Sequence, residues 1–555
     1  LALPTLGGTV CERVRVERTL VCTRSCAVAV YSGCMQTPIF DNRFRTLPGE
    51  HGDPVASRQV WNALWSEARP TRMPAPTLLA ASSSVAGALG WSADDVATPT
   101  FAEVLAGNVL LPGMQPWASN YGGHQFGAWA GQLGDGRAIS LGEVIGVDGS
   151  RCELQLKGAG LTPYSRRGDG RAVLRSSLRE FVCSEAMHAL GVPTTRALSL
   201  VATGEGVLRD MLYNGRTAHE PGAIVCRVAP SFLRFGHFEL PSARGDFALL
   251  RTLWDFMVER DFAELADQPD RDIAVFHAIC ERTALMIAHW MRIGFVHGVM
   301  NTDNFSVLGL TLDYGPFGWM EEYNPDWTPN TTDARERRYR FGEQPNVAHW
   351  NLSCLAGALS SIIEDHDGLR EGLRRYVRYF NLEHTRMNQA KLGLLSWRSE
   401  DADLLQRLYR QLHASRLDFT LFFRQLMHVD VRDLQVAELA FTSYDGAEFE
   451  REASALQAWL QSWTVRVRAD TLDDTKAEFA SKEAMRLSNP CYLPRNWLLQ
   501  QAIQSAEQQD LAPLHHLLRV LQRPYDEQAD ASAFAQRRPE WANDLPGCTV
   551  LSCSS

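Results

Sequence analysis

His297-Gly298-Val299-Met300-Asn301-Thr302-Asp303-Asn304, followed at a short distance by Asp313-Tyr314-Gly315, is the most informative stretch of this chain. Asp303, Asn304 and Asp313 offer carboxylate and amide oxygens. Such hard ligands, used two or three at a time and completed by phosphate and water, suit Mg²⁺ or Mn²⁺. The stretch therefore predicts a metal site that also handles phosphate groups.

Protein kinases carry a related pattern, H-R-D-x-x-x-x-N followed by D-F-G, in which the Asn and the second Asp hold metal on the nucleotide phosphates. His297 and Asn304 keep that spacing, and Asp313 begins the counterpart of D-F-G. Val299 occupies the position of the kinase base, and a valine can neither accept a proton nor orient a hydroxyl. Asp303 is the nearest carboxylate able to act as a base, whereas His297 is expected to hold the loop by hydrogen bonds.

Length and composition describe a large globular protein. The 555 residues (62.0 kDa) exceed one compact core, so two or more lobes are expected. The formal net charge of −10 argues against wholesale binding to nucleic acid or to an anionic membrane. A local basic pocket for phosphates is still compatible with it. No stretch approaches the roughly 18 uninterrupted apolar residues of a membrane helix.

The twelve cysteines form no C-x-x-C pair, which argues against a zinc ribbon or a thioredoxin-type site. Scattered cysteines without a secretory signal favour a reducing compartment, so we expect a cytoplasmic protein, or a mitochondrial one in a eukaryote. Residues 1–34 are arginine-rich but contain Glu12 and Glu17 and lack a sustained apolar segment. We expect them to lie upstream of a true start at Met35.

The order of strand-like and helical patterns predicts an α+β protein with a kinase-like, two-lobed fold. Residues 35–99 are expected to form an N-terminal extension that packs on the main body. Residues 100–250 alternate strand-like runs with glycine-rich turns and are expected to form a mixed, strand-rich N-lobe that binds nucleotide. Residues 251–470 are predominantly helical and are expected to form a C-lobe with the catalytic and metal loops. Residues 471–555 form a C-terminal extension.

A lysine and a glutamate in the predicted N-lobe form a second kinase-like feature. Lys157 ends the strand-like run from Glu153, and Glu180 follows on a helix expected from near Gly170 to Gly191. Kinases use such a pair to hold a lysine against the nucleotide phosphates. Taken alone, the pair could equally be a surface salt bridge. Together with Asn304 and Asp313, it favours a nucleotide site.

Two glycine-rich turns and two arginines complete the candidate phosphate-binding residues. The turn from Gly131 to Arg137 precedes a strand and allows close approach of the backbone to phosphates, although most such turns merely connect strands. The turn from Gly168 to Arg171 precedes the Glu180 helix, and simple capping by Asp169 is the alternative. Arg227 and Arg234 could clamp phosphate in a cleft or lie exposed on the surface.

These motifs together resemble the selenoprotein O family, called YdiU in bacteria. The resemblance covers most of the chain from about Phe40. It rests on the Tyr121–Gly127 stretch, Leu156–Gly160, Arg227–Glu239, and the His297–Asn304 loop with Asp313-Tyr314-Gly315-Pro316-Phe317. Motifs of this length and order are far more specific than any single glycine turn.

The resemblance implies a kinase-like enzyme that binds ATP in a flipped orientation and transfers AMP to Ser, Thr or Tyr hydroxyls of proteins. Transfer of UMP from UTP with Mn²⁺ is also associated with the family. By resemblance, Asp303 is the base, Asn304 and Asp313 bind Mg²⁺ or Mn²⁺, and Lys157 pairs with Glu180. The nucleotide-binding residues are then Gly134, Gly136, Arg137, Lys157, Asp169, Gly170, Arg227, Arg234 and Asp313. Two alternatives are an atypical kinase that transfers the γ-phosphate and a catalytically silent pseudokinase that binds ATP as a scaffold.

The chain ends with two cysteines, Cys548 and Cys553. Cys553 stands where some family members carry selenocysteine, and a thiol near a terminus suits disulfide exchange. We therefore predict a redox switch in which one of them pairs with a cysteine of the body, the candidates being Cys280, Cys354 and Cys491. The sequence does not specify the protein substrates, nor the choice between ATP and UTP.

Overall fold

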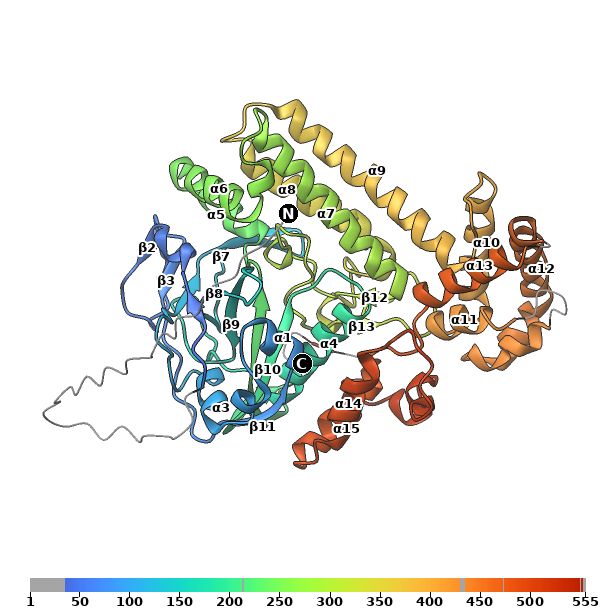
Figure 1. Ribbon diagram of the computed structural model, residues 1–555, viewed down its shortest axis with the longest axis horizontal. Helices are drawn as coiled ribbons and strands as arrows, with labels where there is room; N and C mark the ends of the chain where they lie inside the picture. The colour runs from blue at the N-terminus through green and yellow to red at the C-terminus, as the bar shows by residue number, and fades with distance from the viewer. Residues whose placement is uncertain (1–34, 212–213, 430–434, 473, 550, 553–555) are drawn as a thin grey trace, which may run out of the picture. The chain divides into compact units, whose positions relative to one another are not determined.

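One nine-stranded β-sheet organises the first half of the chain, within the residues that the computed structural model describes: 35–211, 214–429, 435–472, 474–549 and 551–552 (Figure 1). Most neighbouring strands are antiparallel. In spatial order the strands are β2 (Gly49–Glu50), β3 (Trp65–Glu67), β5 (Trp117–Ser119), β8 (Ala138–Ile145), β9 (Arg151–Lys157), β11 (Thr217–Ala229), β10 (Arg196–Asp210) and β4 (Thr77–Ala81), with β1 (Ile39–Phe40) pairing to β8.

The central strands place Lys157 at the end of β9. There it lies between Ala138 of β8 and Val225 of β11 in the register of the sheet. The strand-like runs at 138–147, 152–157, 197–201 and 223–228 predict four strands, and all four are present. β10 and β11 extend well beyond the expected cores, as far as the pair Asp210–Thr217. The outer parts of these two strands are polar and largely exposed, so they lack the apolar alternation that predicts a strand.

Helix α4 (Leu174–Ala189) packs against β10 and β11 and carries Glu180. It begins later than expected from Gly170, because residues 171 and 173 are extended and form bridges with Ala159 and Gly222. Helices α14 (Asn496–Glu507) and α15 (Ala512–Leu521) also pack on α4. Glu180 is buried on the side of α4 that faces the sheet, where Lys157 of β9 and Arg227 of β11 contact its carboxylate.

The second half of the chain is helical. Helix α7 (Arg271–Ile293) runs beside the long α9 (His366–Lys391) and ends at Gly294, which has φ +71° (Figure 1). The chain then passes through β12 (Phe295–Val296) into the His297 loop, and β12 pairs with β13 (Gly318–Trp319) beyond Asp313. This short ladder brings the two motif segments together.

The remaining helices cover the sheet or extend the helical part. They are α1 (Ser83–Ala88), α2 (Ala93–Val96), α3 (Pro99–Leu105), α5 (Phe235–Ala243), α6 (Phe247–Asp261), α8 (Gln344–Leu359), α10 (Asp401–Ala414), α11 (Phe419–Leu426), α12 (Gly446–Thr471) and α13 (Thr475–Ser488). The strand-rich N-terminal part and the helical C-terminal part confirm the predicted α+β, kinase-like class.

Both predicted extensions pack on the rest of the described chain, the C-terminal one through α14 and α15 on α4. Strands β1 to β4, from residues 35–99, belong to the same sheet as the strands of residues 100–250. Residues 1–34, for which an upstream position was expected, lie outside the described residues.

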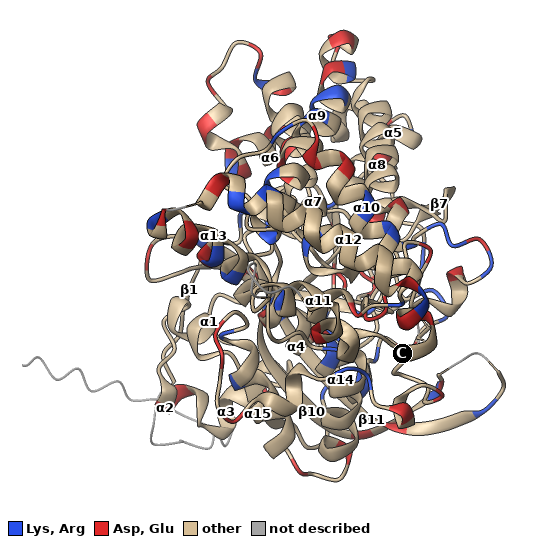
Figure 2. Ribbon diagram, turned by 90° about the vertical axis from the view of Figure 1, so that its right-hand side faces the viewer, with Lys and Arg blue, Asp and Glu red and all other residues tan. Residues whose placement is uncertain are grey.

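Charged side chains of both signs occur along α9 and α13 (Figure 2). Several of them pair within a helix, for example Arg374 with Glu371 and Lys482 with Glu478. Such exposed pairs contribute little to stability. Among the described residues, no helix is both long and apolar enough to span a membrane.

Candidate active site

A cavity of about 710 Å³ lies between the β-sheet and the loops that follow α7. Its wall combines Tyr121, residues 125–126, 133–138 and 164–171, Lys157, Arg209 and Arg227 with seven residues of the 299–316 segment. The lining includes ten residues expected from the sequence, namely Gly134, Gly136, Arg137, Lys157, Asp169, Gly170, Arg227, Asp303, Asn304 and Asp313. The other two expected residues, Glu180 and Arg234, contact Lys157 and Asp313 from behind this wall.

Lys157 and Glu180 form a buried ion pair. Nζ of Lys157 lies 2.5 Å from Oε2 of Glu180, and the side chains are only 11% and 2% exposed. The pair is therefore not the surface salt bridge that the sequence alone allowed. Burial lowers the pKa of Lys157, although the charges of Glu180 and Asp313 oppose this shift.

Asp313 is held by three cations. Arg227 and Arg234 each form an ion pair with its carboxylate, and Lys157 Nζ lies 3.7 Å from Oδ1. Burial opposes ionisation of Asp313, but Arg234, Arg227 and Lys157 outweigh it and hold its pKa well below the ordinary range. With Glu180, two carboxylates thus face three cations, and the excess positive charge is available to phosphate oxygens.

Asp303 has the opposite electrostatic character. Its side chain is buried, with Oδ2 accepting a hydrogen bond from Gln125 Nε2 at 3.2 Å, while Oδ1 receives none from the described residues. Burial raises its pKa to about 7, against the opposing charge of Arg234. A carboxylate with a pKa near neutrality is well suited to accept a proton from a hydroxyl group.

Hydrogen bonds within the His297 loop fix its shape. His297 accepts the main-chain N–H of Val299 at Nδ1 (3.3 Å) and donates from Nε2 to the Leu312 carbonyl (3.0 Å). The ring is buried and stacks on Trp290. Asn304 Nδ2 donates to the Val299 carbonyl at 2.9 Å. His297 therefore joins the two motif segments, as expected, and Val299 lines the cavity where a kinase has its base.

A hairpin of β6 (Gly122–Gln125) and β7 (Ala128–Gln132) covers this loop. The main-chain N–H of His124 donates to Thr302 Oγ1 (2.7 Å), and that of Phe126 donates to Asn301 Oδ1 (3.2 Å). A Cβ atom at Gly123 would lie 2.8 Å from Asp303 Oδ1. The hairpin thus packs directly on the carboxylate that we expect to be the base.

The glycines of the two turns are required by close packing. A Cβ at Gly134 would lie 2.3 Å from the Tyr164 ring, and one at Gly136 would lie 2.9 Å from the Tyr164 carbonyl. Gly170 has φ +70°, and its Cβ would lie 2.2 Å from Gly160. The N–H groups of Gly134 and Gly136 donate within the protein. These two glycines therefore shape the cavity wall rather than present free amides.

Asp169 does not cap the Glu180 helix, which begins at Leu174 without a side-chain cap. Its carboxylate instead accepts hydrogen bonds from Arg209 at 2.6 and 3.0 Å and from the Arg171 N–H at 2.9 Å. Burial opposes ionisation, but Arg209 and the Arg171 amide lower the pKa of Asp169. Arg209 lies 40 residues away on the extended part of β10, where no local pattern indicates its position.

Further basic residues line the cavity that sequence reasoning did not single out. They are Arg166, Arg167, Arg171 and Arg209. The dipeptide Arg166-Arg167, directly after the Thr162–Ser165 turn, was the one local signal that could have suggested a phosphate contact. The basic lining confirms that a negative net charge is compatible with a local basic pocket.

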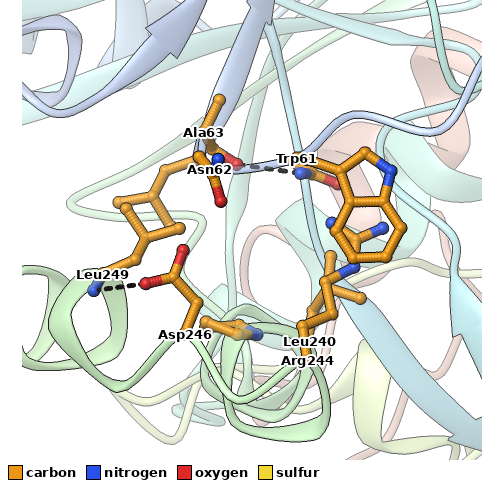
Figure 3. A pocket seen from close by; sticks show the side chains of 10 residues that line it. Trp61, Asn62, Ala63, Leu240, Arg244, Asp246 and Leu249 are labelled. Atoms are coloured by element: carbon orange, nitrogen blue, oxygen red, sulfur yellow. Dashed lines mark hydrogen bonds between the residues drawn. The ribbon is translucent and has the colours of Figure 1, made fainter.

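A second, much smaller cavity of about 40 Å³ lies apart from these residues, between the Trp61–Leu64 segment and the end of α5 (Figure 3). The Arg244 guanidinium lies 4.2 Å from the Trp61 ring centroid, and Asp246 accepts the Leu249 N–H. Its size admits little more than a water molecule. We assign it no function.

The cysteines of the described residues are free thiols, including Cys280, Cys354, Cys491 and Cys548. Cys548 is buried, and burial raises its pKa to about 11, which disfavours the thiolate needed for exchange. Cys553 lies outside the described residues, so the redox switch stays a prediction.

The fold and this cavity define a kinase-like protein with a basic cleft and a buried carboxylate, Asp303, four residues after the position of the kinase base. Sequence comparison identifies the family: the profile described as "Protein adenylyltransferase SelO" matches residues 55–522, and the chain belongs to this family. A "Protein nucleotidyltransferase YdiU" of Xanthomonas campestris pv. campestris (strain B100) is 58% identical over 518 residues, which cover 93% of this chain and 99% of the relative. Proteins of the same name from Xanthomonas oryzae pv. oryzae (strain MAFF 311018) and Xanthomonas axonopodis pv. citri (strain 306) are 57% and 56% identical over the same coverage. The predicted family and the predicted class of enzyme, a protein nucleotidyltransferase, are confirmed.

Proposed function

We propose that this protein transfers AMP from ATP to Ser, Thr or Tyr hydroxyls of other proteins, with Asp303 as the general base. The observation that carries the proposal is the pairing of two carboxylates with opposite character in one cavity. Cations hold Asp313 ionised, whereas burial brings the pKa of Asp303 to about 7. When the pKa values of two neighbouring carboxyl groups are shifted apart in this way, one group stays ionised and the other can accept a proton.

In this proposal, Lys157 and Arg227 bind the β- and γ-phosphates deep in the cavity, and Arg234 supports them from behind the wall by holding Asp313. Their ion pairs with Asp313 and Glu180 hold the three cations close together before phosphate arrives. Arg137, Arg166 and Arg167 lie on the rim and extend the positive charge. The α-phosphate then faces the Asp303 side of the cavity.

Asn304 and Asp313 are the residues that would hold a metal ion. An amide oxygen and an ionised carboxylate are the donors that Mg²⁺ and Mn²⁺ prefer, and the Asp313 carboxylate is partly exposed to the cavity. A bound ion would neutralise charge on the phosphate oxygens. UTP and UMP transfer with Mn²⁺ is the alternative donor chemistry.

The chemical step proposed for Asp303 is proton removal from the acceptor hydroxyl. The acceptor oxygen forms a bond to the α-phosphorus, and the bond from that phosphorus to the bridging oxygen breaks. Pyrophosphate leaves with the electron pair, and the hydroxyl proton moves to Asp303. Val299 cannot accept this proton, which is why the base must come from elsewhere in the loop.

The test is incubation of the protein with ATP labelled at either the α- or the γ-phosphate, with a general protein acceptor such as casein and with the protein itself as acceptor. We expect label from the α-position only. Label from the γ-position only would instead identify an atypical kinase, and binding of ATP without incorporation would identify a scaffold. The Asp313→Ala variant is the negative control, because it removes the proposed metal ligand. A chelator should abolish incorporation, and added Mg²⁺ or Mn²⁺ should restore it.

A further inference from the structure

A cluster of three different metal-ligating side chains lies behind the cavity. One ring nitrogen of His124, a carboxylate oxygen of Glu239 and Sγ of Cys354 all lie within 4.8 Å of one another. Within the part of the chain that the structure describes, it is the one group of three or more His, Cys, Asp or Glu side chains with this geometry. None of the three residues lines the 710 Å³ cavity.

Three separate elements supply the cluster. His124 comes from β6, Glu239 from α5 and Cys354 from α8, and α5 packs against both β6 and α8. Glu239 is almost completely buried, whereas His124 and Cys354 are partly exposed. The cluster is therefore built by tertiary structure and has a route from solvent.

Contacts around the cluster orient its side chains. His124 Nδ1 and Glu239 Oε1 lie 2.7 Å apart, and Glu239 Oε2 accepts a hydrogen bond from Thr302 Oγ1 at 2.5 Å. The His124 ring packs between the rings of Trp129 and Trp350, with centroids 5.1 and 5.4 Å away. Ligands in protein metal sites are commonly oriented by outer contacts of this kind.

The donor set selects the type of metal. Nitrogen, carboxylate oxygen and sulfur together match Zn²⁺, whereas Mg²⁺ and Ca²⁺ prefer oxygen ligands only. Bonds of about 2.0–2.3 Å in a tetrahedron place ligand atoms roughly 3–4 Å apart. The three side chains need only small rotations to reach that spacing, and water can complete the coordination.

We propose that His124, Glu239 and Cys354 bind one transition-metal ion, with Zn²⁺ the best match, at a site separate from Asn304 and Asp313. On binding, the Cys354 thiol loses its proton to solvent and the sulfur coordinates as thiolate. The ion would fasten the β6–β7 hairpin to α5 and α8. Because Glu239 and His124 both contact Thr302, it would also steady the loop that carries Asp303. The binding claim does not depend on the proposed function.

The direct test uses Co²⁺ as a spectroscopic probe on the chelator-stripped full chain. We expect roughly equimolar binding, a thiolate-to-cobalt charge-transfer band in the near ultraviolet, and displacement of that band by Zn²⁺. The band should disappear in Cys354→Ser and persist in Cys152→Ser, a matched change at another partly exposed free cysteine. It should also persist in Asp313→Ala, which separates this site from the nucleotide-linked one. Absence of the band in the wild type, or its persistence in Cys354→Ser, would refute the proposal.

X-ray absorption on the zinc-loaded wild-type protein gives a result that does not depend on any variant folding. One sulfur at about 2.3 Å with nitrogen or oxygen neighbours supports the site, and a shell of nitrogen and oxygen alone overturns it.

Hydrogen exchange then tests whether the bound ion steadies the loop that carries Asp303. Zn²⁺ should slow exchange of the His124 and Phe126 amides, which donate to the catalytic loop. Unchanged exchange would refute the coupling to the loop.

Discussion

Replacing Asp303 by Asn should make the protein more stable while nearly abolishing turnover. The carboxyl has its pKa raised from 3.8 to about 7 in the folded protein, so the folded state binds its proton more tightly than the unfolded state does. Stability is therefore lost as pH rises from 3.8 to about 7 and is constant above that. At 1.36 kcal/mol per pH unit, the full cost of this buried charge is about 4 kcal/mol.

An asparagine has nearly the same shape and no charge, so it removes this cost. The free energy of unfolding of Asp303→Asn should exceed that of the wild type by about 2 kcal/mol at pH 5 and by up to about 4 kcal/mol at pH 8. Denaturant unfolding at several pH values measures this difference. Turnover should fall by about 10²–10⁴, as is typical when a general base is lost.

Glu153→Gln is the matched control. Burial raises the pKa of Glu153 to about 8, but this residue does not line the cavity. Its replacement should likewise stabilise the protein at high pH, with activity retained. For the wild type, kcat/KM should rise with pH through an apparent pKa of about 7, and this limb should be absent in Asp303→Asn. The reasoning is wrong if the stability difference at Asp303 does not grow with pH, or if Asp303→Asn keeps full turnover.

Four further variants and one control test the other parts of the site and the C-terminal segment. Lys157→Ala should weaken ATP binding and lower turnover, and Glu180→Gln should do so less severely. Titration calorimetry measures the binding, and incorporation of α-label measures the turnover. Equal ATP binding by the wild type and both variants would contradict the role of Lys157 in binding phosphate. Gly123→Ala places a methyl group 2.8 Å from the Asp303 carboxylate and should lower turnover about 10- to 100-fold, whereas Gly357→Ala, with nothing within 4 Å, should not. Leu551→Asp buries a charge where the C-terminal segment pairs with residues 329–331 and should lower the melting temperature; an unchanged melting temperature would show that this segment is not tied down.

The parts of the fold that the sequence could predict are those with a regular apolar pattern or a spaced polar motif. The cores of β8, β9 and α7 follow from their apolar runs, and the His297–Asn304 spacing identified the loop that closes the cavity. The predicted helix with Glu180 is present, although its first turn is replaced by extended chain. That replacement depends on pairing with Gly222, a long-range contact that no local pattern encodes.

The environment of each site residue could not be predicted in the same way. The ion pairs of Asp313 need Arg227 and Arg234, which come from a strand and from a helix start far along the chain. The partner of Asp169 is Arg209, on a polar part of β10 that carries no strand signal. These neighbours determine which carboxyl groups are ionised. The pKa shifts of Asp313 and Asp169 therefore could not be predicted from the sequence.

Under the proposed function, the β6–β7 hairpin accounts for a kinase-like loop that works without its usual base. In this protein the loop presents a carboxylate at Asp303, next to Asn304, instead of at Val299. A carboxylate there becomes a useful base only if its pKa is brought near neutrality, and that requires exclusion of water. The hairpin contributes to this, because Gly123 packs against the Asp303 side chain and Gln125 donates the one side-chain hydrogen bond that the Asp303 carboxylate accepts within the described residues. The loss of the kinase aspartate and the presence of the hairpin are therefore two parts of one arrangement. Val299→Asp, which leaves the hairpin unaltered, should still incorporate label only from the α-phosphate of ATP, because Asp303 and the three cations around Asp313 would keep their positions.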